Sequence, residues 1–188
     1  MSDFTKKIFY NCTNAPYEVL SNLLREAFQE RIDSNLNFGC ALFTSEDLKR
    51  NTKDAYIVCF FDGDMPIAMG VVSEKRKGLI KYGHFEFLAV SPNKRYRGKG
   101  LGSQIQSECL CIAKQLGLEL VTSTTAVEAI SSVRTHLKTG FKIYCVKHYP
   151  ERNYISYNFY YPLKLSLMNV ILFIIRKPLV LITRILIK

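Results

Sequence analysis

The sequence lacks the features that mark secreted and metal-binding proteins. Its six cysteines form no Cys-x-x-Cys pair, and no apolar signal peptide follows Met1-Ser2-Asp3. Closely spaced cysteine pairs bind zinc or form redox disulfides, and a signal peptide directs a chain to an oxidising compartment. We therefore expect neither a metal site nor disulfides, and we expect the protein to work in a reducing cytoplasm.

Internal repeats and linkers are also absent from residues 4–162. The chain has 188 residues, of which 48% are hydrophobic and 12% aromatic, so disorder is excluded as its main character. Half of the net charge of +10 lies in residues 163–188, which contain five basic residues and no acid. The modest excess elsewhere fits an anionic cofactor, so we expect no nucleic acid partner.

Glycine and positive charge are concentrated in the segment 95–103, between an apolar run and an amphipathic helix. Gly98, Gly100 and Gly102 let the backbone approach a ligand, and a helix that begins near Gly100 directs unpaired N–H groups at it. Positive charge comes from Lys94, Arg95, Arg97 and Lys99. The pattern predicts a site for an anion as dense as a diphosphate; the alternative is an ordinary turn with solvated lysines.

The glycine spacing excludes two common phosphate loops. Gly-x-Gly-x-Gly at 98–102 matches neither a Walker loop nor the dinucleotide fingerprint. The pattern Arg95-x-x-Gly98-x-Gly100, preceded by Phe87-Leu88-Ala89-Val90-Ser91-Pro92, resembles the acyl-CoA motif of the GCN5-related N-acetyltransferase (GNAT) family. The resemblance implies that acetyl-CoA is held by Leu88, Val90, Arg95, Arg97, Gly98, Lys99, Gly100, Gly102 and Ser103. Backbone N–H groups near Leu88 and Val90 are implied to hold the pantetheine and the oxyanion.

Hydrophobic periodicity predicts seven strands and four helices. Strands are expected at 5–11, 55–61, 66–72, 79–90, 118–122, 141–146 and 154–161, and helices at 15–28, from 44, at 100–116 and at 128–138. Residues 31–43 and 75–78 are predicted loops, and Asp62-Gly63-Asp64 a hairpin turn. The resemblance implies that the loop at 31–43 borders the acceptor. The element order matches the family's. We predict an α+β fold over residues 1–162, with a central, mostly antiparallel sheet of about seven strands flanked by helices.

Two candidate bases lie on the strand predicted at 79–90. Period-two alternation assigns one face to His84, Glu86 and Leu88 and the other to Phe85, Phe87 and Ala89. His84 and Glu86 then point the same way, roughly 7 Å apart along the strand. The resemblance implies that the general base occupies one of these two positions, without choosing between them. The alternative is a hydrogen-bonded pair without catalytic duty.

A second family motif is matched only in part. Lys138-Thr139-Gly140-Phe141 fits its end, but His136 stands where the family has the tyrosine that protonates the departing thiolate. With an ordinary pKa of about 6.5, a histidine can serve as an acid. The alternatives are a surface histidine without this role, or an acid supplied by Tyr144 or Tyr149.

The segment 163–188 exceeds what the family core needs. Arg176-Lys177-Pro178 interrupts its apolar residues, which makes a membrane-spanning helix too costly. Wound as a helix, the segment has a basic arc opposite a wide apolar face. This predicts an amphipathic helix lying on an anionic membrane surface; the alternative is a helix docked on the domain or on the partner of a homodimer.

The leading hypothesis is an acetyl-CoA-dependent N-acetyltransferase that acetylates the amine of a small-molecule acceptor by direct attack on the thioester. We expect it to be peripheral on the inner face of the cytoplasmic membrane. The alternatives are a CoA-binding or basic interaction module without catalysis, and a protein or peptide N-acetyltransferase. Turnover distinguishes an enzyme from the non-catalytic module, because only an enzyme releases the free thiol of CoA.

Overall fold

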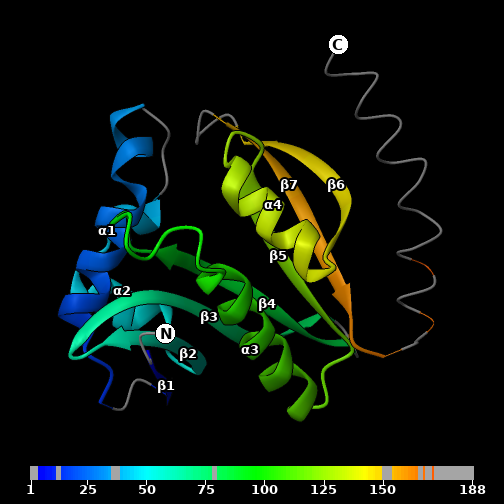
Figure 1. Cartoon of the computed structure of the whole chain (residues 1–188). Helices are drawn as coiled ribbons and strands as arrows, with labels where there is room; N and C mark the ends of the chain where they lie inside the picture. Colours follow the sequence, from blue (N-terminus) through cyan, green and yellow to red (C-terminus); the bar gives the residue numbers. More distant parts are fainter. Residues whose placement is uncertain are drawn as a thin grey trace.

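A computed structural model describes residues 4–11, 14–34, 39–77, 80–149, 154–164, 167 and 171. Seven strands form one sheet in the order β1-β2-β3-β4-β5-β7-β6 (Figure 1). The strands are β1 (Thr5–Tyr10), β2 (Ala55–Asp62), β3 (Met65–Lys77), β4 (Ile80–Val90), β5 (Leu120–Ala126), β6 (Lys142–Tyr149) and β7 (Tyr154–Pro162). Each neighbouring pair is antiparallel except β4 and β5, which are parallel. The predicted fold class is confirmed.

Helices cover both faces of the sheet (Figure 1). They are α1 (Tyr17–Asp33), the short 3-10 helix η1 (Gly39–Leu42), α2 (Ser45–Asn51), α3 (Leu101–Gln115) and α4 (Ile130–Thr139). Leu24 of α1 packs with Met69 on one face, whereas Ile105 of α3 packs with Phe85 on the other. Strand alternation therefore supplies two apolar layers, one under α1 and α2 and one under α3.

Local signals fix several element ends as predicted. Thr44 caps α2: its side chain accepts a hydrogen bond from the Asp47 N–H, and the Asp47 side chain accepts one from the Thr44 N–H. Gly63, in the predicted hairpin turn, has φ 61°, and Gly140 ends α4 in the left-handed region. Each signal acts within four residues, which is why it can be recognised without the tertiary structure.

Two predicted loops are shorter than expected. Helix α1 continues through Arg31 to Asp33, so the loop predicted at 31–43 is wrong at its start. Strand β3 continues to Lys77, so residues 75–77 pair with β4 instead of forming a connection. The Glu74 carboxylate lies 3.3 Å from Arg76 Nε and 3.7 Å from Lys81 Nζ, which offsets the repulsion between these basic side chains.

A bulge in β4 changes which side chains share a face. Val71 of β3 pairs with Glu86 and Met69 pairs with Ala89, so β4 has one extra residue between these pairs. Phe87 has φ 54° at this point. A regular alternation therefore ends after Glu86.

The predicted faces of β4 are correspondingly wrong beyond the bulge. Leu88 packs with Phe85 in the layer under α3, although the two were expected on opposite faces. Phe87 and Ala89 pack in the layer under α1. The reason is the inserted residue, which shifts the period-two pattern by one position.

The predicted tail helix lies mostly outside the described residues. Leu167 and Ile171, which are described, are 76% and 39% exposed. Strand β7 ends at Pro162, and the N–H groups of Leu163 and Lys164 donate to the Glu119 carbonyl. Within the described part of the chain, no helix has the length and apolar character needed to cross a membrane. The division at residue 162 and the role of the tail stay predictions.

Candidate active site

The sheet splits between β4 and β5. These strands pair only at Gly83 with Val121, His84 with Thr122 and Phe85 with Ser123. Beyond these pairs β4 continues beside β3, while β5 continues beside β7. The divergence turns the backbone edge of β4 after Phe85 toward an open space instead of toward a neighbouring strand.

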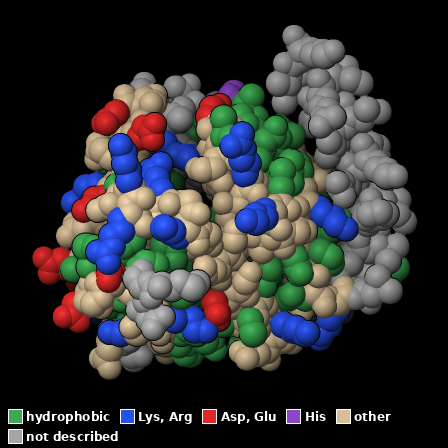
Figure 2. Space-filling model, viewed as in Figure 1, with side chains coloured by type: hydrophobic (Ala, Val, Ile, Leu, Met, Phe, Trp, Pro, Cys, Tyr) green, Lys and Arg blue, Asp and Glu red, His purple; other side chains and the backbone are tan. Residues whose placement is uncertain are grey.

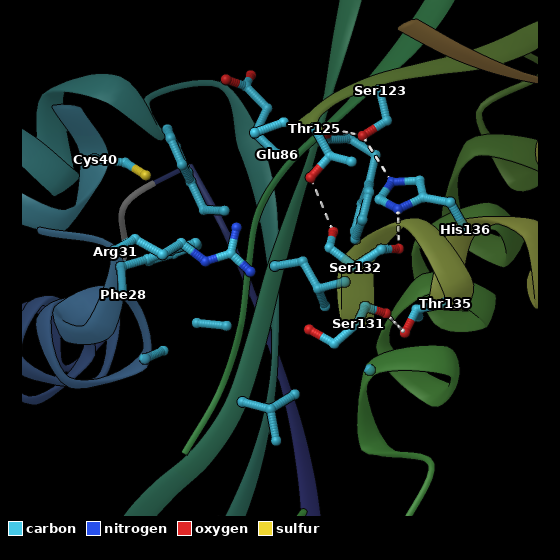
Figure 3. Close-up of a pocket in the computed structure, with 18 of the residues that line it drawn as sticks. Phe28, Arg31, Cys40, Glu86, Ser123, Thr125, Ser131, Ser132, Thr135 and His136 are labelled. Carbon is cyan, nitrogen blue, oxygen red and sulfur yellow. Dashed lines mark hydrogen bonds between the residues drawn. The ribbon is translucent and has the colours of Figure 1, made fainter. Parts of the chain in front are cut away.

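A cavity of about 1,070 Å³ lies at this split. Its walls come from α1 and η1 on one side and from α4 on the other, with β4 and β5 behind (Figure 3). The loop between β4 and α3 closes one part of it. Lys and Arg side chains gather on this face of the molecule (Figure 2), and those that line the cavity are Arg31, Arg97, Arg134 and Lys138.

The glycine-rich loop contributes its backbone to the cavity, as the sequence predicts. Gly98 and Gly100 have φ of 73° and 76°, a region that side chains other than glycine rarely adopt. Gly100 caps α3, so the first N–H groups of this helix face the same space. The predicted cofactor residues that line the cavity are Leu88, Val90, Arg97, Gly98, Gly100, Gly102 and Ser103.

Arg95 and Lys99 are not brought into the cavity lining. Arg95 Nη2 lies 3.0 Å from Asp62 Oδ2, and its guanidinium lies 5.5 Å from the centre of the Tyr96 ring. The Tyr96 hydroxyl donates to the same Asp62 oxygen at 2.8 Å. This cluster fastens the loop to the end of β2. The local sequence pattern does not predict this cluster, because Asp62 is distant from the loop along the chain.

His84 and Glu86 both line the cavity. The Thr122 hydroxyl donates to the Gly83 carbonyl, at 3.2 Å, and lies 2.9 Å from His84 Nδ1. Since that hydroxyl has one hydrogen, Nδ1–H donates to Thr122 Oγ1, and Nε2 keeps the lone pair that a general base needs. Burial lowers the pKa of His84, with a smaller lowering by Lys75 and an opposing effect of Glu86. The ring is therefore neutral at neutral pH.

The Glu86 carboxylate has its own hydrogen-bond partner. Ser73 Oγ on β3 donates to Glu86 Oε1 at 3.3 Å. This bond orients the side chain from the neighbouring strand, on the face that His84 shares. The two predicted bases are thus in one cavity, each held by a hydroxyl group.

His136 is buried, with 2% of its surface exposed, so the surface alternative is wrong. Its Nδ1 lies 2.8 Å from the Ser132 carbonyl, which can only accept, so Nδ1 carries the hydrogen. Nε2 lies 2.9 Å from Ser123 Oγ, and the single hydrogen of that hydroxyl is shared between Nε2 and the Phe85 carbonyl, which lies 3.1 Å from the same oxygen. Burial lowers the pKa of His136 to about 4, against a raising effect of the Ser132 hydrogen bond. The expectation of an ordinary histidine pKa is wrong, because aromatic rings surround the imidazole.

The stacking around His136 explains this burial. Its ring lies 4.6 Å from the Phe159 ring, 5.2 Å from that of Phe141 and 5.9 Å from that of Phe85. Tyr144, considered as a substitute acid, packs edge-on against Tyr160 and is not among the residues lining the cavity. The side chain of Tyr149 lies outside the described residues.

Protonation of His136 is expected to destabilise the fold in acid. Its pKa of about 4 in the folded state lies below its ordinary value of 6.5, so the unfolded chain binds the proton more tightly. The stability from the neutral ring is complete above about pH 6.5 and is lost as the pH falls toward 4. Urea unfolding at a series of pH values measures the free energy of unfolding, which should fall less between pH 6.5 and 4 for His136→Gln than for the unaltered protein. Equal falls in the two proteins would contradict the low pKa of His136.

The sequence does not predict the individual positions of two groups of cavity residues. Arg31 extends from α1 into the cavity (Figure 3), whereas the sequence predicts only a loop near the acceptor from residue 31, and a loop gives its side chains no defined direction. The other group consists of hydroxyl side chains from β5 and α4: Ser123, Thr124, Thr125, Ser131, Ser132 and Thr135. The hydroxyl run at 122–125 was a visible signal, since it continues a strand that would otherwise be apolar.

Comparison with known proteins agrees with this geometry. The family model described as Acetyltransferase (GNAT) family matches residues 17–141. No curated protein matches the chain.

Solved structures resemble the fold over most of the chain. The NatC complex bound to Gag peptide and CoA matches with a TM-score of 0.66 and 15% identity, covering 86% of this chain and 99% of that one. The protein yncA of Salmonella typhimurium, solved with its cofactor acetyl-CoA, matches with a TM-score of 0.64 and 13% identity, covering 86% of this chain and 96% of that one. An aminoglycoside 6'-acetyltransferase type Ii matches with a TM-score of 0.63 and 15% identity, covering 86% of this chain and 99% of that one.

Proposed function

Because the chain belongs to the acetyltransferase (GNAT) family, we propose that it transfers the acetyl group of acetyl-CoA directly to the amine of a small-molecule acceptor. One observation carries this proposal. The glycine-rich loop and two candidate bases face a single cavity, at the point where β4 and β5 separate. Anion binding and proton removal, two of the requirements of this reaction, thus converge on one space.

The cavity fits acetyl-CoA, which supplies the activated acetyl thioester when bound. Gly98 and Gly100 leave the loop backbone uncovered, and the first N–H groups of α3 favour phosphate oxygens. Arg97 adds a positive charge beside them. Backbone N–H groups of β4 at Leu88 and Val90, beyond its last pair with β5, are the proposed donors to the pantetheine and the thioester oxygen.

Glu86 and His84 are the proposed route for the acceptor's proton. An amine attacks only as the free base, so a group that accepts its proton within the cavity raises the reactive fraction. His84 Nε2 and the Glu86 carboxylate can each accept this proton, and Thr122 and Ser73 orient them. A water molecule can extend their reach to the amine.

His136 is proposed as a positioning residue and not as the acid for the leaving thiolate. Its one ring hydrogen is used by the Ser132 carbonyl, and its low pKa leaves no second proton at neutral pH. Through Nε2 it holds Ser123, and Ser123 lies opposite Phe85 at the last pair before the split. The ring thereby links α4 to the fork of the sheet.

A small acceptor is supported by the size of the cavity. About 1,070 Å³ is shared by cofactor and acceptor, and α1, η1 and α4 form walls around it. Peptide acetylation is the second candidate, because the similar NatC structure is bound to a Gag peptide as well as to CoA. The similarity to an aminoglycoside 6'-acetyltransferase supports the small-molecule acceptor of the main proposal.

The place of action is likewise proposed from the sequence. Residues 163–188 carry about half of the net charge, and winding them as a helix would place a wide apolar face opposite it, a combination that binds anionic lipid surfaces. We propose that this segment holds the enzyme on the cytoplasmic side of a membrane. A homodimer contact by the same segment is the competing proposal.

Release of free thiol tests the reaction. The full chain is incubated with acetyl-CoA and a panel of small amines, and free CoA is measured with a thiol reagent while mass spectrometry identifies the acetylated product. We expect thiol release that depends on one class of amine. A parallel series of peptides with free or blocked N-termini tests the second candidate. Binding of CoA without release on any amine or peptide would leave a non-catalytic module and overturn the proposal.

A further inference from the structure

Arg31 brings a positive charge into the cavity from the α1 side. Figure 3 shows its guanidinium reaching from α1 toward α4, within the space that Glu86 also lines. The side chain is half-buried, and its guanidinium carbon lies 5.8 Å from the centre of the Phe28 ring, one turn earlier in the helix. A guanidinium placed over an aromatic face is held in one orientation, and its planar N–H groups match the geometry of carboxylate and phosphate oxygens.

Basic side chains outnumber acidic ones in the cavity lining: Arg31, Arg97, Arg134 and Lys138 line it, against Glu30 and Glu86. Burial lowers the pKa of Arg31; Glu30, Glu128 and Cys40 raise it, and Arg97 lowers it. An anion bound between Arg31 and Arg97 would offset the repulsion between the two guanidinium groups. The anion then gains charge-assisted hydrogen bonds in a partly desolvated site.

Hydroxyl groups line the opposite wall. Ser131 and Ser132 of α4 and Thr125 of β5 lie across the cavity from Arg31 (Figure 3). Thr125 Oγ1 donates to Ser132 Oγ at 3.0 Å, so the hydrogen of Ser132 is left to donate elsewhere. The Arg31 guanidinium on one wall and hydroxyl donors on the other suit an acid group that is planar, such as a carboxylate, or tetrahedral, such as a phosphate.

We propose that Arg31 binds an acid group of the acceptor, so that the acceptor is an amine that also carries a carboxylate or a phosphate. This inference rests on the proposed acetyl transfer and adds the class of substrate. It disfavours polycationic amines, whose additional charges would lie against Arg31. It also makes Arg31 a specificity residue, one that determines which amine is accepted and takes no proton.

Matched acceptor pairs test the inference. α-Amino acids are compared with their amides, and phosphoethanolamine with ethanolamine, by thiol release under identical conditions. The amine of an amino acid amide is the weaker base, so amine reactivity alone favours the amide over the acid. We expect the acid of at least one pair to be preferred nonetheless, and the favoured pair distinguishes carboxylate from phosphate. Equal use of both members of every pair would overturn the inference while leaving the acetyl transfer intact.

The variant Arg31→Gln should remove this preference. We expect the KM for the acid acceptor to rise about 10- to 100-fold, with the neutral partner nearly unchanged. Arg31→Lys should give a KM for the acid acceptor between those of Arg31→Gln and the unaltered protein, because lysine keeps the charge but lacks the planar guanidinium. Arg25→Gln is the control, since Arg25 lies exposed on the same helix and does not line the cavity.

Two binding measurements distinguish failure of the proposed anion site from failure of the proposed acetyl transfer. Calorimetry of CoA with Arg31→Gln should give the unaltered affinity; a weakened affinity would assign Arg31 to the cofactor and overturn the inference. Calorimetry of N-acetyl amino acids and their amides on the CoA-loaded protein needs no turnover. Preference for the acid, lost in Arg31→Gln, supports the anion site even if the proposed reaction fails.

Discussion

Gly100→Asp is expected to abolish CoA binding while the protein stays folded. The substitution adds a side chain where φ is 76° and a negative charge at the N-terminus of α3, where phosphate is proposed to bind. Since hydrogen bonds to charged groups contribute about 1.5–3 kcal/mol each, we expect an affinity loss of at least about 100-fold. Isothermal calorimetry with CoA measures it, and thermal unfolding verifies the fold.

The control for this variant is Gly63→Asp. Gly63 has a similar φ of 61°, with nothing within 4 Å of an added side chain, and it lies in the turn between β2 and β3, outside the cavity lining. It carries the same backbone strain and the same charge away from the proposed phosphate site. An unchanged CoA affinity in Gly100→Asp, or an equal loss in Gly63→Asp, would overturn the assignment of the loop.

Glu86→Gln or His84→Ala is expected to lower kcat about 100- to 10,000-fold at neutral pH, the usual contribution of a general base. The variant of the true base should show this loss with CoA affinity unchanged, because neither side chain belongs to the glycine-rich loop. Glu26→Gln is a matched control, since Glu26 is an exposed carboxylate on α1 that does not line the cavity. Full activity of both variants would place the base elsewhere.

The pH dependence of kcat/KM identifies which group acts. A base works when it is deprotonated, so activity is present above its pKa and lost as the pH falls through it. Burial lowers the pKa of His84, so a limb due to His84 should lie below the ordinary histidine range. That limb should disappear in His84→Ala and persist in Glu86→Gln. The opposite pattern would assign the base to Glu86.

Much of the fold could be predicted because its signals are local. The capping pair Thr44 and Asp47, the turn at Gly63 and the apolar periodicity of α3 each act within a few residues. The glycine-rich loop is equally local, since a positive φ and a helix N-terminus are properties of adjacent residues. The same holds for placing His84 and Glu86 together, because they lie before the bulge of β4.

The remaining parts of the site depend on contacts between distant segments. The faces of Phe87 and Leu88 follow from the pairing of β4 with β3, and Arg95 is tied to Asp62 of β2. His136 resembles a surface histidine when only its helix is considered, yet Phe159 and Phe141 bury it. No periodic pattern within one element contains this information.

The sequence by itself determined the family, the order of elements and the loop proposed to hold CoA, because these depend on residue types at short spacing. The tertiary structure alone decided how the cavity is used. It separated β4 from β5, turned Arg95 away from the cavity lining and brought Arg31 into it, and it lowered the pKa of His136. The physical reason is that burial, charge proximity and strand divergence arise only when segments far apart in the chain pack together.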